Sequence, residues 1–244
     1  MTLPAALPPE VRRVAHEEIG STNSEALRLA EAGAPEFTLV TARRQSAGRG
    51  RRGRAWMSPD SNLFASIVLR PQRPPATASQ LSFVAALAVG ELLDRLGVRG
   101  RIGFKWPNDV LIDGAKVSGI LLESGDGHVV AGIGVNLAHY PVGTAYPTTS
   151  VAVAGGQIDV ERALARLVAA LLGWYGRWLA GGFAPIRAAW LERAHGLGHE
   201  VHVTLHDGAT DSGVFSALDE SGALVLTRAG TTRKITAGDV FFAA

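Results

Sequence analysis

Residues 105–122 read KWPNDVLIDGAKVSGILL, and this stretch decides how the middle of the 244-residue chain folds. Apolar runs flank Asp113-Gly114, a dipeptide that supplies the positive φ values of a two-residue type I′ turn. Side chains of a strand alternate between two faces, so the two runs are expected to pair as antiparallel strands. The pattern therefore predicts a β-hairpin.

The turn also sets which residues lie opposite each other in this hairpin. It places Leu111 opposite Lys116 and Asp109 opposite Ser118. Asp109 and Lys116 then lie on one face as diagonal neighbours. A carboxylate and an ammonium group are thus expected within reach of one ligand.

Hydrophobic periodicity predicts an α+β domain followed by a small β domain. The first ten residues have the composition of an irregular terminus. After Gly196 the sequence pattern changes to that of short alternating strands, which is typical of an SH3-like β-barrel. We place the larger domain at residues 1–196 and the smaller at residues 197–244. Strands are expected at residues 12–18, 37–44, 63–69, 128–137, 201–205, 214–218, 224–227 and 240–242, and helices at 21–33, 79–96, 160–178 and 184–194.

The composition excludes several kinds of chemistry. The chain has no cysteine, which rules out disulfides and a cysteine nucleophile. The formal net charge of +2 is too small to predict binding of nucleic acid over the whole surface. No unbroken apolar run approaches the roughly 18 residues of a membrane span, and no charged-then-apolar leader opens the chain. We expect a cytoplasmic protein with neither a membrane nor a nucleic-acid partner.

The strand expected at residues 128–137 carries an unusual stripe. Period-two alternation places Gly132, Gly134 and Asn136 on one face and apolar residues on the other. A face without side chains that leads to an amide suits a ligand lying flat on the sheet.

Arginine is concentrated in one glycine-rich segment. Residues 48–53 match GxGxxG, but a strand follows where a dinucleotide site requires a helix, and no P-loop or kinase motif occurs. A solvated basic patch, or one that contacts nucleic acid, is an alternative. The interleaved glycines favour a backbone that wraps closely on an anion, with forked guanidinium donors and with Trp56 as a stacking face for a purine. Six arginines lie within twelve residues, namely Arg43, Arg44, Arg49, Arg51, Arg52 and Arg54.

The segment at 105–109 also has two interpretations. It is either the end of a strand with a proline turn, where Asn108 and Asp109 cap local backbone, or part of a site. Two of the three lysines of the chain, Lys105 and Lys116, flank this Asn-Asp step among apolar residues. Unpaired charges in such a place are costly, and a metal-bound phosphate would be a suitable partner.

Taken in order, several motifs resemble those of the bacterial biotin–protein ligases, from about Ile19 to the C-terminus. The resemblance implies a mixed β-sheet backed by helices, of the class II synthetase-like type, with a small C-terminal SH3-like β-barrel. It also implies a monofunctional enzyme, because the N-terminal winged helix-turn-helix of the family's bifunctional members has no counterpart in the sequence. The motifs are STN at 21–23, QSAGRGRRGRAW at 45–56, KWPNDV at 105–110, KVSGIL at 116–121 and GIGVNL at 132–137.

The resemblance implies an ATP-dependent reaction that forms biotinyl-5′-AMP and transfers biotin to a lysine of a biotin carboxyl carrier domain. Lys116, Arg51 and Asp109 would be the catalytic residues, with Asp109 also the expected ligand of Mg²⁺ and a candidate proton acceptor. The implied biotin-binding residues are Ser21, Thr22, Asn23, Gln45, Gly48, Arg49, Gly50, Arg51, Lys116, Gly132 and Gly134. The implied ATP-binding residues are Arg49, Arg51, Arg52, Trp56, Lys105, Asn108 and Asn136.

Two other functions stay open at this point. A lipoate–protein ligase shares the fold and the adenylation chemistry, although the arginine-glycine motif of that family is not found in the sequence. A nucleic-acid-binding protein would use the arginine segment for phosphate contacts and would show steeply salt-dependent affinity without ATP turnover. We expect a monomer or a weak homodimer.

Overall fold

The computed structural model describes residues 6–205 and 207–242, so the first half of the expected irregular terminus lies outside the described residues. Its larger part is a seven-stranded mixed sheet in the order β1-β2-β3-β7-β6-β5-β4, in which β1 runs parallel to β2 and the other neighbours are antiparallel. The strands are β1 (Arg12–Ile19), β2 (Thr38–Gln45), β3 (Leu63–Leu69), β4 (Ile102–Lys105), β5 (Asp109–Ile112), β6 (Ala115–Gly125) and β7 (His128–Val135).

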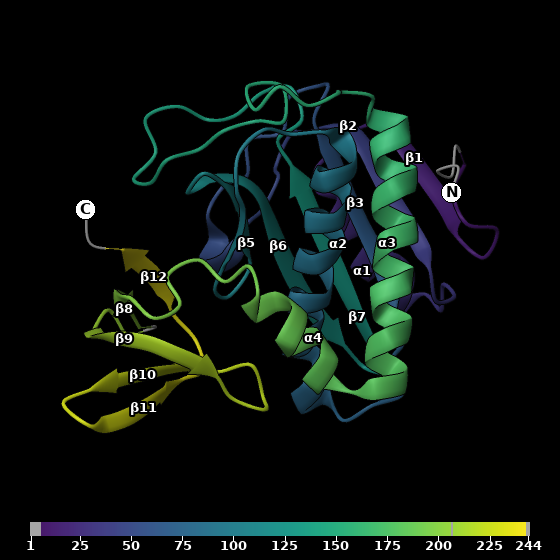
Figure 1. Ribbon diagram of the computed structural model, residues 1–244. Helices are drawn as coiled ribbons and strands as arrows, with labels where there is room; N and C mark the ends of the chain where they lie inside the picture. Colours follow the sequence, from purple (N-terminus) through teal and green to yellow (C-terminus); the bar gives the residue numbers. More distant parts are fainter. Residues whose placement is uncertain (1–5, 206, 243–244) are drawn as a thin grey trace.

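Helices cover both faces of this sheet (Figure 1). Helices α2 (Leu81–Leu96) and α3 (Val160–Gly181) pack side by side on one face, and α4 (Phe183–Leu191) extends them toward the C-terminal part. Helix α1 (Thr22–Glu31) lies on the opposite face, where Ala26 and Ala30 pack on Val40, Val68 and Val130. The mixed sheet backed by helices that was expected is confirmed.

Helix α2 is apolar on nearly every side because it is buried between the sheet and α3. A 3-10 turn, η2 (Pro75–Gln80), precedes it, so the α-helix begins two residues after the expected start at position 79. The continuous segment Pro75–Leu96 is long and apolar enough to cross a membrane, although the sequence was expected to hold no such segment; 72% of its most apolar window is buried inside the fold. A core helix meets the same criterion.

The hairpin of β5 and β6 forms, but its register differs from the expected one. Leu111 pairs with Lys116 as predicted, whereas Asp109 pairs with Gly119 and not with Ser118. The prediction for Asp109 was wrong because a β-bulge shifts the register beyond Leu111. The carbonyl oxygen of Val117, inside the bulge, accepts a hydrogen bond of 2.8 Å from the backbone of Asn136.

The C-terminal part is a five-stranded antiparallel sheet in the order β11-β10-β9-β8-β12. The predicted second sheet is present, and it contains a further strand, β11, that the sequence pattern did not predict. Among the described residues no pairing between β11 and β12 closes the sheet into the expected barrel. The strands are β8 (Glu200–Thr204), β9 (Thr210–Leu218), β10 (Leu224–Arg228), β11 (Thr231–Ile235) and β12 (Asp239–Phe242).

The segment that joins the two sheets is fixed to the larger one. The backbone N–H of His195 donates to the carbonyl of Phe104 at 2.7 Å, and the N–H of Phe104 donates to Arg193 at 2.8 Å. Buried residues of the C-terminal sheet, such as Phe215 and Leu226, belong to the same hydrophobic cluster as α2 and α3. The two sheets therefore share one core, which places β12 beside the larger sheet (Figure 1).

Candidate active site

A cavity lies on the α1 side of the large sheet, beside the N-terminus of that helix. Its floor is the glycine stripe of β7 together with Ser66 of β3 and Gly119 of β6, and its roof is the arginine segment. The lining residues are Ser21, Thr22, Asn23, Gln45, Arg49, Gly50, Arg51, Arg54, Ala55, Trp56, Phe64, Ser66, Asn108, Lys116, Gly119, Ile120, Leu121, Gly132, Ile133, Gly134 and Tyr146.

The polar end of the cavity is formed by a network of hydrogen bonds. Ser21 caps α1, and its side chain accepts from the N–H of Ser24. Gln45 Oε1 accepts from the N–H of Thr22 at 2.8 Å and from its hydroxyl at 3.1 Å. Ser66 Oγ lies 2.8 Å from both Thr22 Oγ1 and Asn23 Oδ1. These partners hold donors and acceptors in fixed positions for a small polar ring.

Asn23 connects this network to a carboxylate that the sequence did not single out. Its Nδ2 donates to Glu123 Oε2 at 2.7 Å, and Arg49 Nη2 donates to the same oxygen at 2.9 Å. Gly132 lies directly beneath Asn23, and a Cβ at this position would overlap the Asn23 amide. The missing side chain of Gly132 is thus required by the packing of Asn23.

The arginine segment folds down so that Trp56 covers the glycine stripe. A Cβ on Gly134 would stand 2.6 Å from Trp56 Nε1, and one on Gly119 would stand 2.9 Å from the same ring. Trp56 Nε1 is buried and has no hydrogen-bond partner. An orphan donor in a polar cavity is satisfied when a ligand with an acceptor enters. Gly48 does not line the cavity, but a Cβ there would collide with Ser58 Oγ and the Trp56 carbonyl, so Gly48 permits the fold of the segment.

Lys116 stands at the opposite end of the cavity. Its Nζ forms an ion pair of 2.7 Å with Asp109 Oδ1. The expected proximity of the two charges is thus observed, although the bulge brings it about. The Nζ of Lys116 also lies 5.4 Å from the ring centroids of Trp56 and Tyr146.

Two cations near Lys116 are held out of bulk water. Burial lowers the pKa of Lys105, and the adjacent Lys116 lowers it further. Burial also lowers the pKa of Arg51, whose Nη1 donates to Asn108 Oδ1 at 3.2 Å. Desolvated cations gain more from an incoming anion than hydrated ones do. This end of the cavity is therefore suited to phosphate and carboxylate groups.

Two family models match the chain. The biotin/lipoate A/B protein ligase family matches residues 17–138, and the biotin protein ligase C terminal domain matches residues 196–243. The chain is 45% identical over 234 residues to a biotin–[acetyl-CoA-carboxylase] ligase of Paracoccus denitrificans, with 91% of this chain and 97% of that protein covered. The chain belongs to the biotin protein ligase family.

Further relatives and a solved structure agree with this assignment. The ligase is 34% identical to the bifunctional ligase/repressor BirA of Bacillus subtilis, a match that covers 92% of this chain and 72% of that protein. The structure of the biotin protein ligase of Aquifex aeolicus in complex with biotin and ATP superposes with a TM-score of 0.82 at 26% identity, covering 94% and 97% of the two chains. The second family model and these names favour biotin over lipoate.

Not every residue expected in the site of the ligase lies at the cavity. Asn136 is buried, and its Nδ2 donates to the carbonyl of Thr149 at 3.1 Å, so it supports the segment that carries Tyr146. Arg52 points to Asp239, and Lys105 lies against Tyr146 and β12 instead of lining the cavity. Conversely, the sequence reading missed Ser66, Glu123 and Tyr146. Of these three residues, only Ser66 could have been found from the sequence, because it is the one polar residue in an otherwise apolar strand.

The described residues contain no group of three or more His, Asp or Glu side chains that could cage a metal ion. Mg²⁺ ordinarily needs only one or two carboxylates when it arrives with nucleotide phosphates. The carboxylate of Asp109 beside Lys116 fits that lesser requirement.

Proposed function

We propose that the ligase joins biotin and ATP to form biotinyl-5′-AMP and then transfers the biotinyl group to a lysine of a biotin carboxyl carrier domain. The observation that carries the proposal is that one cavity has two chemically different ends. A hydrogen-bond network at Thr22, Asn23 and Gln45 suits a ureido ring, and desolvated cations at the other end suit a carboxylate next to a phosphate.

In the first step an oxygen of the biotin carboxylate attacks the α-phosphorus of ATP, and pyrophosphate leaves. The reaction needs charge stabilisation more than acid or base, so fixed cations supply most of the effect. We assign Lys116 and Arg51 to the α-phosphate and carboxylate oxygens, and Trp56 to the adenine. Arg49, Asn108 and Lys105 are proposed as further contacts of the nucleotide, whereas Arg52 and Asn136 would act indirectly through their protein partners.

We further propose that Mg²⁺ accompanies ATP and that Asp109 supplies a protein ligand to it. When bound, the metal would neutralise charge on the phosphates. The pairing of Asp109 with Lys116 keeps both groups ready to exchange partners when the nucleotide arrives.

In the second step the neutral amine of the acceptor lysine attacks the acyl carbon, and AMP leaves. The amine must lose a proton, and Asp109 is the carboxylate next to Lys116 that can accept it. The arginine segment covers the cavity and would exclude water from the mixed anhydride until the acceptor arrives.

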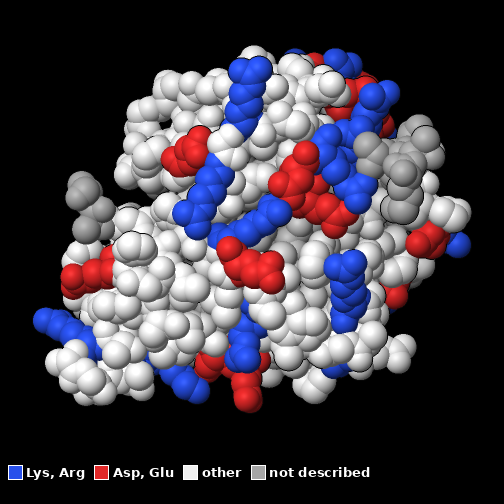
Figure 2. Space-filling model, in the orientation of Figure 1, with Lys and Arg blue, Asp and Glu red and all other residues white. Residues whose placement is uncertain are grey.

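The domain roles follow from this division of contacts. We propose that residues 1–196 bind biotin and ATP and that residues 197–244 support the arginine segment. The ligase is further proposed to work in the cytoplasm, as a monomer or a weak homodimer. On the face shown in Figure 2, Lys and Arg side chains lie among Asp and Glu instead of forming one basic surface. Such a surface gives no support to the nucleic-acid alternative.

The test is to incubate the ligase with ATP, Mg²⁺ and biotin, with and without a biotin carboxyl carrier domain. Pyrophosphate release is followed together with the mass of the carrier. Biotin-dependent pyrophosphate and a carrier heavier by one biotinyl group are expected. Turnover with lipoate but not with biotin would contradict the proposal, and pyrophosphate without carrier modification would contradict the acceptor.

A further inference from the structure

Three arginines of the roof converge on one carboxylate of the C-terminal sheet. Asp239, the first residue of β12, has Oδ2 3.1 Å from Arg52 Nη1 and Oδ1 3.2 Å from Arg54 Nη2. Arg51 Nη1 lies 3.8 Å from the same Oδ1 and 3.4 Å from the carbonyl oxygen of Gly238. The Asp239 side chain is 19% exposed, whereas those of Arg52 and Arg54 are 31% and 49% exposed, so the carboxylate is more shielded from solvent than its partners.

The convergence counters a repulsion that is built into the segment. Three guanidinium groups within four residues repel each other, and neighbouring Arg52 and Arg54 are among the groups that lower the pKa of Arg51. One carboxylate leaves this cluster with a net charge of about +2, from three cations and one anion. Asp239 therefore gathers the arginines without cancelling their attraction for a polyanion.

The backbone of the segment is strained at one residue. Arg52 has φ of 56° and ψ of 32°, in the left-handed region that residues with a side chain rarely adopt. The 3-10 turn at 51–53 has no side-chain cap. Besides its local backbone hydrogen bonds, the turn contacts Asp239, which lies 187 residues further along the chain from Arg52.

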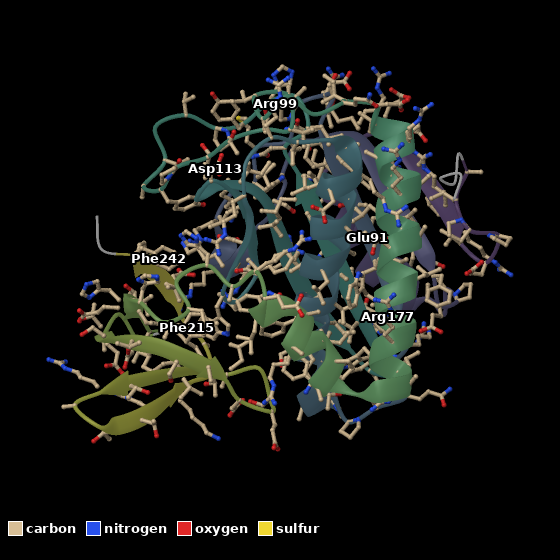
Figure 3. All side chains as sticks on the ribbon, in the orientation of Figure 1. Glu91, Arg99, Asp113, Arg177, Phe215 and Phe242 are labelled. Carbon is tan, nitrogen blue, oxygen red and sulfur yellow. The ribbon has the colours of Figure 1, made fainter. Side chains whose placement is uncertain are left out.

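The strand that carries Asp239 contacts the site a second time. Phe241 and Phe242 of β12 place their rings 5.5 and 5.8 Å from Lys105 Nζ, and Tyr146 adds a third ring at 5.4 Å. Figure 3 labels Phe242 on β12, with Phe215 within the same sheet. β12 itself is held by antiparallel pairing of Asp239 with Thr204 on β8. The C-terminal sheet thus presents one fixed strand to both groups of cations.

We propose that Asp239 is a positioning residue of the ligase, which assembles Arg51, Arg52 and Arg54 over the cavity before ATP binds. The proposal rests on the proposed function for its kinetic consequence only. Its structural consequence, a closed arginine segment in the ligand-free protein, is independent of the identity of the substrates.

The first experiment measures the segment without any ligand. Wild-type protein, Asp239→Asn, Asp239→Glu and Asp211→Asn are digested briefly with trypsin, and cleavage after residues 49–54 is followed by mass spectrometry. Asp211 is the matched control, because it pairs with Arg233 at 2.9 Å within the C-terminal sheet and its side chain is 16% exposed. We expect cleavage to be about tenfold faster in Asp239→Asn, because proteolysis follows the population of the open segment. Asp239→Glu and Asp211→Asn should stay near the wild-type rate.

The second experiment measures pyrophosphate release by the same four proteins. Asp239→Asn should raise KM for ATP about tenfold while kcat and KM for biotin change by less than about threefold, because the arginines are dispersed and not removed. A lower KM for ATP would overturn the proposal, since Asp239 would then compete with phosphate. Equal cleavage rates in Asp239→Asn and Asp211→Asn would overturn it as well.

A further variant separates loss of the contact from a folding defect in the C-terminal sheet. Arg52→Gln breaks the pair from the side of the segment and leaves the C-terminal sheet untouched. It should speed tryptic cleavage after Arg49, Arg51 and Arg54, and the double variant should be cleaved no faster than Asp239→Asn alone, because Arg52 acts through its contact with Asp239. Additive effects would contradict the pairing, and a wild-type protein that shows a protected segment but no biotin turnover would contradict the proposed function alone.

Discussion

Trp106 Nε1 donates a hydrogen bond of 3.0 Å to the carbonyl oxygen of Gly222, and this bond links the KWPND segment to a turn of the C-terminal sheet. Trp106 is 3% exposed. Gly222 has φ of +90°, and a Cβ there would stand 2.8 Å from the ring of Phe83 on α2. The turn can approach the larger domain this closely only with glycine at its tip.

Replacing Trp106 with phenylalanine should destabilise the protein by about 1–3 kcal/mol, because the buried carbonyl of Gly222 loses its donor. The measurement is urea unfolding monitored by circular dichroism. Trp174→Phe is the matched control. Trp174 Nε1 donates to the carboxylate of Glu91, and in the variant a surface water can take the place of this donor. Equal losses in the two variants would argue against the buried bond as the cause.

Gly134→Ala should abolish most of the adenylation activity. A methyl group at this position meets the Trp56 indole at 2.6 Å, so the roof must lift and the floor is obstructed. We expect pyrophosphate release to fall by more than about 10²-fold, in the range seen when a reacting group is misplaced. Gly103→Ala on β4 is the control, because its Cβ would find only ordinary contacts of 3.5 Å or more. Comparable activity in both alanine variants would refute the packing argument.

Lys116→Met should lower kcat for pyrophosphate release by roughly 10²–10³-fold, the range for losing one group that stabilises a transition state. The variant also leaves Asp109 without its cation. Lys234→Met serves as the control, because Lys234 is 67% exposed and its pair with Asp219 lies at the surface. Retained turnover in Lys116→Met would remove Lys116 from the proposed first step.

Arg51→Gly should release free biotinyl-5′-AMP. The substitution removes a guanidinium that lines the cavity and contacts Asn108, so the roof would retain the mixed anhydride less well. Biotinyl-AMP in the filtrate and biotin on lysines of bystander proteins such as serum albumin are the measured quantities. Arg44→Gly, at a surface pair with Glu18, is the control and should leave both unchanged.

Stability should fall in acid because of Asp219. Burial would raise the pKa of this carboxyl, but hydrogen bonds from Ser221, Lys234 and the backbone of Ala223 hold the pKa well below its usual range. A lowered pKa in the folded state stabilises the fold above the unfolded value of about 3.9, and this contribution is lost as pH falls below it. Asp219→Asn should be less stable than the wild type at pH 7, and its stability should fall less between about pH 5 and pH 3.

The test for Asp219 is the urea midpoint at several pH values. Glu220→Gln, next in the chain and exposed, is the control and should keep the acid profile of the wild type. Parallel profiles for Asp219→Asn and the wild type would show that another group causes the acid sensitivity.

The sequence by itself determined most of the elements and the identity of most residues around the cavity. Strand alternation predicted that Gly132 and Gly134 share a face, and the Asp113-Gly114 turn predicted the hairpin, since both depend on a few neighbouring residues. The motif order indicated the ligase family, which the matches confirm. The β-bulge at Val117 was not predictable from the turn, because it depends on the backbone of Asn136.

Only the tertiary structure decided which partners the cations of the site have. Arg49 meets Glu123 across 74 residues, and Arg52 meets Asp239 across 187. No local periodicity relates positions so far apart. Glu123 lies on β6 of the large sheet and Asp239 on β12 of the C-terminal sheet, so each contact depends on how the arginine segment packs against these strands. Backbone hydrogen bonds between Lys116 and residues 147–149 bring Tyr146 over Lys116, and Asn136 donates to Thr149 of the same segment instead of lining the cavity. Local chemistry thus specified the residues of the site, and long-range packing specified their partners.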